Sequence, residues 1–143
     1  MRYNMDVWSL FARDFAATAR LAMLYIQEAH AQDEWPISSA RLSRTGAPIL
    51  INQHRTLQER LGACSDFVRD FGISTEHIEV AVDAVEGNPF QTAYAAWPIR
   101  WYIFHHGAAG PVVAKIGMPD DGSFDLTQVR DLLEQWQGQR QGQ

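Results

Sequence analysis

Two apolar segments of strand length, on either side of a helical segment, constrain the fold of this chain most strongly. Residues 20–26, RLAMLYI, form a short run that is continuously apolar after Arg20, as in a strand that is buried on both faces. Residues 77–83, HIEVAVD, place an apolar side chain at every second position, which is typical of a half-buried strand. Residues 54–72 carry an apolar stripe at helical spacing, made of Leu57, Leu61, Cys64 and Val68. The order strand, helix, strand predicts a crossover connection between two parallel strands.

Further segments complete the predicted order of elements. Residues 4–19 and residues 125–136 each place apolar side chains on one helical face, and Asp125 with Gln128 predicts a cap for the later helix. Residues 100–117 are two apolar stretches around a turn rich in glycine and alanine, which predicts an antiparallel hairpin. The segment QTAYAA predicts one helical turn. The order α-β-α-β-β-β-α predicts an α/β protein with a mixed central sheet and flanking helices, as in the thioredoxin-like plan. That plan opens with a strand before the first helix, and we expect this first strand to be absent from the chain.

Composition and charge exclude several classes of partner. The 143 residues suit one domain, which we expect over residues 1–138, with a polar tail at residues 139–143. Hydrophobic residues make up 46% of the chain, enough for a buried core. The net charge of −5 disfavours binding to nucleic acid or to an anionic membrane. No apolar run approaches the roughly 20 residues of a membrane span, and the first residues lack the pattern of a signal peptide. We therefore expect a cytoplasmic protein without a membrane segment or a nucleic-acid partner.

The single cysteine, Cys64, limits the redox and metal chemistry of the chain. It excludes an intramolecular disulfide, a Cys-x-x-Cys pair and a zinc site built from cysteines. Because Cys64 lies on the apolar stripe of its helix, we expect a buried, inert thiol rather than a nucleophile. The histidines form no pair with the spacing of metal ligands; they are His30, His54, His77, His105 and His106. Neither a metal site nor a bound cofactor is expected.

Ionisable side chains follow the first strand abruptly. Glu28 and His30 come directly after it, and Trp35 follows in the long irregular segment of residues 31–50, which is either functional or mobile. Strand carboxyl ends and helix N-termini meet at one edge of an α/β sheet, so these side chains are expected to open on one cleft. Each also has a structural reading: a surface histidine, a solvated acid, and a tryptophan that anchors the loop on the core. His54, just before the central helix, could equally serve only the start of that helix.

Three segments carry a resemblance to a known family. The first, YIQEAHAQDEW, resembles the strand-end signature of iodothyronine deiodinases, in which tyrosine, isoleucine, two glutamates, alanine and histidine precede an aspartate, a glycine and a tryptophan. Gln27 replaces the first glutamate and Glu34 replaces the glycine. The second, HRTLQERL, is similar to the family's His-x-x-Leu-Gln-Asp-Arg-Leu. The third, VD followed by YAAWPIRWYIF, is similar to the family's strand end and its Tyr-Ala-Ala-Leu-Pro-Glu-Arg-Leu-Tyr-Val-Ile. The matches occur in order from about Phe15 to Trp136.

The resemblance implies a thioredoxin-like fold and a selenol or thiol oxidoreductase that removes halogen from an aromatic ring by reduction. Such an enzyme places a selenocysteine or cysteine at a helix N-terminus, which stabilises the anion, and it uses an external thiol reductant. The implied catalytic positions are His30, Glu28 and His54, and the implied substrate-binding positions are Trp35, Pro98 and Arg100. His30 would supply a proton or pair with the selenolate, and Glu28 would orient it. Pro98 is expected to follow a cis peptide bond, and a homodimer is one implied assembly.

Two departures from the family pattern bear on activity and substrate. The family's nucleophile starts the first helix, and counting back from YIQEAH places it just ahead of Met1. We therefore expect a truncated form of a selenoprotein, inactive without its nucleophile. No arginine near Met118 matches the family's carboxylate-binding arginine, and Ile99 replaces a family glutamate, which argues against a thyronine substrate. Two alternatives stay open: a thiol peroxidase or reductase that acts on a peroxide, and a binding module without catalysis.

We predict an in-frame UGA codon, or a cysteine codon, immediately upstream of the Met1 codon, preceded by a reading frame for an apolar strand. UGA encodes selenocysteine but is read as a stop by ordinary gene prediction. Sequencing the upstream DNA checks this. Unrelated or out-of-frame sequence at that position would contradict it and would favour the binding module.

Overall fold

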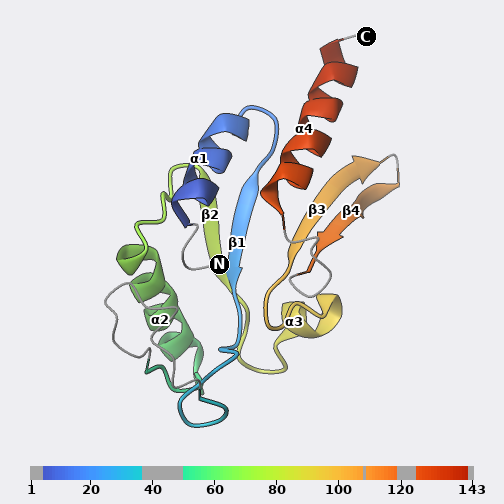
Figure 1. The fold of residues 1–143 in the computed structure, drawn as a ribbon. Helices are drawn as coiled ribbons and strands as arrows, with labels where there is room; N and C mark the ends of the chain where they lie inside the picture. Colours follow the sequence, from blue (N-terminus) through green and yellow to red (C-terminus); the bar gives the residue numbers. More distant parts are fainter. Residues whose placement is uncertain (1–4, 37–49, 108, 119–124, 142–143) are drawn as a thin grey trace. The chain divides into compact units, whose positions relative to one another are not determined.

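The structure is a computed structural model that describes residues 5–36, 50–107, 109–118 and 125–141 (Figure 1). The chain forms two compact units, Met1–Ala95 and Ala96–Gln143. The first unit contains, in chain order, α1 (Met5–Phe15), β1 (Leu21–Tyr25), α2 (Leu57–Asp70), β2 (Ile78–Val82) and α3 (Pro89–Tyr94). The second contains β3 (Trp101–Gly107), β4 (Gly110–Gly117) and α4 (Leu126–Gln141). These elements confirm the predicted α/β class, and the short helix α3 corresponds to the predicted helical turn.

The first unit is built on a parallel pair of strands. β1 and β2 pair over their whole length, from Leu21 opposite Ile78 to Tyr25 opposite Val82. The N–H of Asp83 donates to the carbonyl oxygen of Tyr25 at 2.9 Å and continues the pairing by one step. Because α2 lies between the two strands in the chain, the predicted crossover is confirmed. α1 runs opposite to β1, so its N-terminal end and the carboxyl end of β1 point the same way (Figure 1).

One face of this parallel pair carries the apolar core of the first unit. Side chains alternate along a strand, so Leu21 and Met23 of β1 share a face with Ile78 and Val80 of β2. Residues of α1, α2 and the turn after α2 pack on the same face; they are Trp8, Ala12, Phe67, Val68, Phe71 and Ile73. Both helices therefore cover one face of the pair, and the alternation predicted for β2 is confirmed by burial.

Helix α2 buries only part of the predicted stripe: Cys64 is buried, as expected, and Val68 packs on the core. Leu57, by contrast, is 50% exposed and Leu61 is 41% exposed. The cation Arg60, which is not part of the predicted apolar stripe, is only 1% exposed. An apolar stripe shows which side chains could be buried, whereas hydrogen-bond partners decide whether a guanidinium can be.

Buried Arg60 fastens α2 to the segment that follows β2. Its Nη1 donates to the carbonyl oxygens of Asp83 at 3.0 Å and Ala84 at 3.1 Å, and to Oδ1 of Asn88 at 2.8 Å. The carboxylate of Asp83 accepts hydrogen bonds from the first N–H groups of α3, those of Phe90 and Gln91, each at 3.0 Å. Asp83 thus caps a helix whose N-cap residue makes no side-chain cap of its own.

The second unit contains the predicted hairpin and closing helix. β3 and β4 pair antiparallel, and the peptide bond before Pro98 is cis, as expected. The N–H of Thr127 donates to Oδ1 of Asp125 at 2.9 Å, so Asp125 caps α4, which continues to Gln141. The indole of buried Trp101 lies against the opposite residue, Gly117, where an added Cβ would overlap the ring.

Two glycine-to-alanine substitutions are expected to change stability in opposite directions. Gly62 lies within α2 with no atom inside 4 Å of an added Cβ, so Gly62→Ala should stabilise the chain by about 0.5–1 kcal/mol. Gly117→Ala should destabilise it by about 1–3 kcal/mol because Trp101 must move. Urea unfolding of both variants checks the pair. Equal effects, or a neutral Gly117→Ala, would show that Trp101 does not pack there.

Candidate functional site

The loop after β1 and the segment before α2 are joined by hydrogen bonds. The N–H of Gln32 donates to the carbonyl oxygen of Ile51 at 2.8 Å. The N–H of Gln53 donates to Oδ1 of Asp33 at 2.7 Å, and Nη2 of Arg55 lies 3.2 Å from the other carboxylate oxygen of Asp33. The two bonds to the carboxylate lower the pKa of Asp33, and the backbone bond from Gln53 contributes most. The start of α2 is thereby brought to the carboxyl end of β1.

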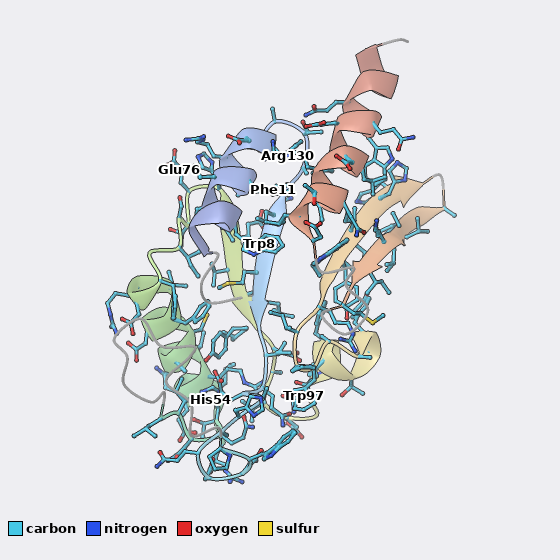
Figure 2. All side chains as sticks on the ribbon, in the orientation of Figure 1. Trp8, Phe11, His54, Glu76, Trp97 and Arg130 are labelled. Atoms are coloured by element: carbon cyan, nitrogen blue, oxygen red, sulfur yellow. The ribbon has the colours of Figure 1, made fainter. Side chains whose placement is uncertain are left out.

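Helix α2 has a well-defined start beside this junction. Oγ1 of Thr56 accepts from the N–H of Glu59 at 3.2 Å, and the carboxylate of Glu59 accepts from the N–H of Thr56 at 3.2 Å. This reciprocal capping fixes the first turn of the helix. His54, two residues before Thr56, lies near the carboxyl end of β1, where its ring is 5.9 Å from that of Tyr25 (Figure 2).

Tyr25, Glu28 and His54 form a polar cluster at the end of β1. The hydroxyl of Tyr25 donates a hydrogen bond to Oε1 of Glu28. The rings of Tyr25 and His54 lie 5.9 Å apart between centroids. His54 is only 6% exposed, and neither ring nitrogen has a hydrogen-bond partner among the described residues. A buried imidazole without partners is costly, which makes it a candidate for contact with a reacting group.

The surroundings of His54 favour its neutral form. Burial lowers its pKa most, and the positive charge of Arg60 acts in the same direction. The carboxylates of Glu28 and Glu59 oppose this effect, Glu28 more strongly. A neutral imidazole next to a carboxylate can take up a proton and return it, which general acid–base chemistry requires.

His30 and Trp35 form a second, more exposed pair on the same loop. Nδ1 of His30 lies 3.3 Å from the carbonyl oxygen of Trp35, and the two rings lie 5.2 Å apart between centroids. Trp35 is 64% exposed, so the alternative that it anchors the loop on the core is wrong. The expected pairing also differs in detail: the carboxylate of Glu28 bonds to Tyr25 and acts on His54, while the ring of His30 lies against Trp35.

Pro98 and Arg100 belong to the second unit. Nη1 of Arg100 lies 3.3 Å from the carbonyl oxygen of Ile99. The substrate-binding roles of Pro98 and Arg100 remain predictions from the resemblance. We also predict that the cleft of Glu28, His30 and Trp35 lies near the start of the first helix, residues 1–6, of which residues 1–4 lie outside the described residues.

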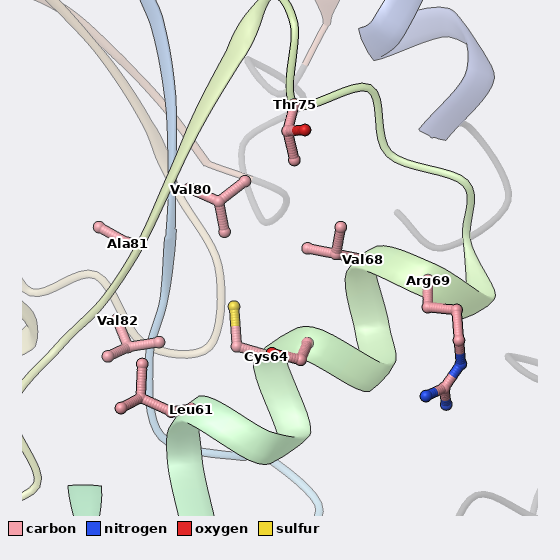
Figure 3. Close-up of a pocket in the computed structure, with 9 residues that line it drawn as sticks. Leu61, Cys64, Val68, Arg69, Thr75, Val80, Ala81 and Val82 are labelled. Carbon is pink, nitrogen blue, oxygen red and sulfur yellow. The ribbon is translucent and has the colours of Figure 1, made fainter. Parts of the chain in front are cut away.

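Cys64 has the surroundings of an inert thiol. It points from α2 toward Val80 and Val82 of β2, in a groove of about 380 Å³ (Figure 3). The other residues that line the groove are Leu61, Ser65, Val68, Arg69, Thr75 and Ala81. Burial raises the pKa of Cys64, which disfavours the thiolate that a nucleophile needs.

Three contributors to this region, Tyr25, Gln53 and Arg60, were not among the site residues predicted from the sequence. Gln53 is a buried amide whose type and position give no signal in a single sequence. Arg60 lies four residues before Cys64 on α2, and this spacing could have placed it on the buried face.

Within the described residues, no His, Cys, Asp or Glu group is arranged to hold a metal ion. No helix in that part of the chain is long and apolar enough to cross a membrane.

The depressed pKa of His54 predicts a loss of stability in acid. As the pH falls through the ordinary histidine value of 6.5, the unfolded chain binds a proton before the folded chain does. The free energy of unfolding should therefore decrease on acidification, and His54→Gln should remove that part of the decrease. Urea unfolding at about pH 7.5 and about pH 5.5 checks this, with the exposed His106→Gln as the control. An acid loss in His54→Gln as large as in the parent would contradict it.

Comparison with known proteins places this chain in one family. The sequence model of the iodothyronine deiodinase family matches residues 2–137. The type I iodothyronine deiodinase of Xenopus laevis is 29% identical over 105 residues, which are 73% of this chain and 36% of that protein. The thyroxine 5-deiodinases of Bos taurus and Homo sapiens are 29% and 28% identical over 139 residues, or 97% of this chain.

The chain spans 41% and 40% of the length of those two thyroxine 5-deiodinases. The family match nevertheless extends over nearly all of the chain and includes the Tyr25, Glu28 and His54 cluster. This chain belongs to the iodothyronine deiodinase family.

Proposed function

We propose that this chain carries the proton-handling groups of a deiodinase-like selenol or thiol oxidoreductase that removes halogen from an aromatic ring. The observation that carries the proposal is buried His54, with unpartnered ring nitrogens beside the Tyr25 and Glu28 pair. Relatives named thyroxine 5-deiodinase support a small iodinated aromatic as the class of substrate.

The proposed reaction requires both a soft nucleophile and a proton. A selenolate or thiolate attacks the halogen, so that a selenium– or sulfur–halogen bond forms and the carbon–halogen bond breaks. The ring carbon keeps the bonding electrons and takes a proton. Two molecules of an external thiol then reduce the selenenyl or sulfenyl halide, which releases halide and restores the nucleophile while a disulfide forms.

The described side chains suit the proton transfer in this reaction. His54, held neutral by burial, accepts or returns a proton, and Glu28 stabilises its charged form. His30, on the loop after β1 that also carries Glu28, is proposed as a second proton donor. Exposed Trp35 offers an aromatic face on which a ring substrate can stack.

The nucleophile is proposed to come from a segment outside these 143 residues. Cys64 is the single cysteine, and its raised pKa and its place in the groove at β2 disfavour attack on a halogen. The segment would precede α1, whose N-terminal end points the same way as the carboxyl end of β1. The 143-residue chain alone is therefore expected to be inactive.

The test is iodide release with dithiothreitol from an iodinated phenol and from thyroxine. We expect release by the chain that is extended upstream in its native frame, with cysteine at the nucleophile position. In that extended chain, His54→Gln and Glu28→Gln should each lower kcat by about 10²-fold, because proton transfer is lost. His106→Gln, on the second unit's hairpin, is the matched control.

Three outcomes would contradict the proposal. Release by the 143-residue chain that disappears with Cys64→Ser would assign the chemistry to Cys64. Reduction of a peroxide without release of iodide would favour the thiol peroxidase. Unchanged kcat in His54→Gln would remove the buried histidine from the mechanism.

A further inference from the structure

Gln53 pairs with the backbone of Glu28 through both ends of its amide. Its Nε2 donates to the carbonyl oxygen of Glu28 at 3.0 Å, and its Oε1 accepts from the N–H of Glu28 at 3.2 Å. One side chain thus satisfies both backbone groups of a loop residue, as a neighbouring strand would. Gln53 is 8% exposed, so these bonds form away from bulk water.

The same residue holds the rest of the loop. Nε2 of Gln53 also donates to Oε2 of Glu34 at 3.0 Å, and its backbone N–H donates to Oδ1 of Asp33 at 2.7 Å. Both amide protons of the side chain are therefore used. The pattern requires glutamine, since a glutamate here would lack both donors and would face the carboxylate of Glu34.

We propose that Gln53 is the positioning residue of the site. It sets where the carboxylate of Glu28 lies relative to His54, the residue that follows Gln53 in the chain. The side chain of Glu28 projects from a backbone unit that Gln53 holds at both polar groups, so the carboxylate has a defined origin. The carboxylate of Glu28 then accepts from the hydroxyl of Tyr25, and its charge acts on His54, whose ring lies beside that of Tyr25. This inference rests on the proposed function, because the placement matters for chemistry only if Glu28 and His54 handle protons.

The titration of His54 reports this placement without any substrate. The charged groups that act on His54 are Glu28, Arg60 and Glu59, and the ring of Tyr25 lies against it. Removing the negative charge of Glu28 should lower the pKa of His54, since a nearby carboxylate favours the imidazolium. The size of that decrease measures how closely the carboxylate and the ring are held together.

The experiment is a double-mutant cycle on the 143-residue chain. The pKa of His54 is measured by NMR titration of the imidazole in the parent, Glu28→Gln, Gln53→Ala and the double variant, and His54→Gln assigns the signal. We expect Glu28→Gln to lower the pKa in the parent, and the decrease to shrink to less than about half in the Gln53→Ala background. Gln58→Ala, at an exposed glutamine on α2, should leave the decrease unchanged.

Equal decreases with and without Gln53 would overturn the inference and leave Gln53 as a residue that only stabilises the fold. Gln53→Glu keeps the side-chain volume and one acceptor oxygen but removes both donors, so it replaces Gln53→Ala if that variant does not fold. In the Gln53→Glu background, Glu28→Gln should again lower the pKa of His54 by less than it does in the parent. The result is distinct from failure of the proposed function, because absent iodide release with intact coupling would reject the activity and keep Gln53 as the positioning residue.

Discussion

The buried guanidinium of Arg60 is the constraint on which the first unit depends. A cation taken out of water must be surrounded by acceptors, and the chain supplies the carbonyl oxygens of Asp83 and Ala84 and the side chain of Asn88. These partners all lie just beyond β2, so Arg60 fixes α2 against the strand ends. The position of α2 in turn places its own start, and with it His54, beside Tyr25 of β1.

The site forms where three backbone segments end at the same edge. β1 contributes Tyr25 and leads to Glu28, the segment before α2 contributes His54, and α3 is tied to the same edge by the bond from Nε2 of Gln91 to Oε1 of Gln27 at 3.1 Å. Polar groups at such an edge can be buried only if they satisfy one another, and nearly all of them do. Among the described residues, three side chains at this edge keep a buried polar atom without a partner: His54 at both ring nitrogens, Arg60 at Nε and Gln91 at Oε1. Arg60 and Gln91 form hydrogen bonds through their other side-chain nitrogens, whereas both ring nitrogens of His54 lack a partner, which favours His54 as the reactive group.

The sequence predicted the elements better than the contacts between their side chains. Apolar periodicity was enough for the crossover, the hairpin and α4, because backbone hydrogen bonds and burial follow directly from it. It failed at Leu57 and Leu61, which are exposed, since the buried face of α2 was decided by the partners of Arg60. The resemblance supplied the positions Glu28, His30 and His54. Which of these side chains lie together depends on the contacts that Gln53 and Tyr25 make. The contact between Gln53 and Glu28 joins residues 25 positions apart in the chain, which no spacing rule reports.

The most direct test of the central claim, that Tyr25, Glu28 and buried His54 form one cluster, is NMR of the 143-residue chain. Nuclear Overhauser effects between the rings of Tyr25 and His54 report their proximity, which the structure gives as 5.9 Å between centroids. The account predicts clear cross-peaks between these rings at neutral pH. A His54 ring that shows cross-peaks to residues of α2 but none to Tyr25 would contradict it.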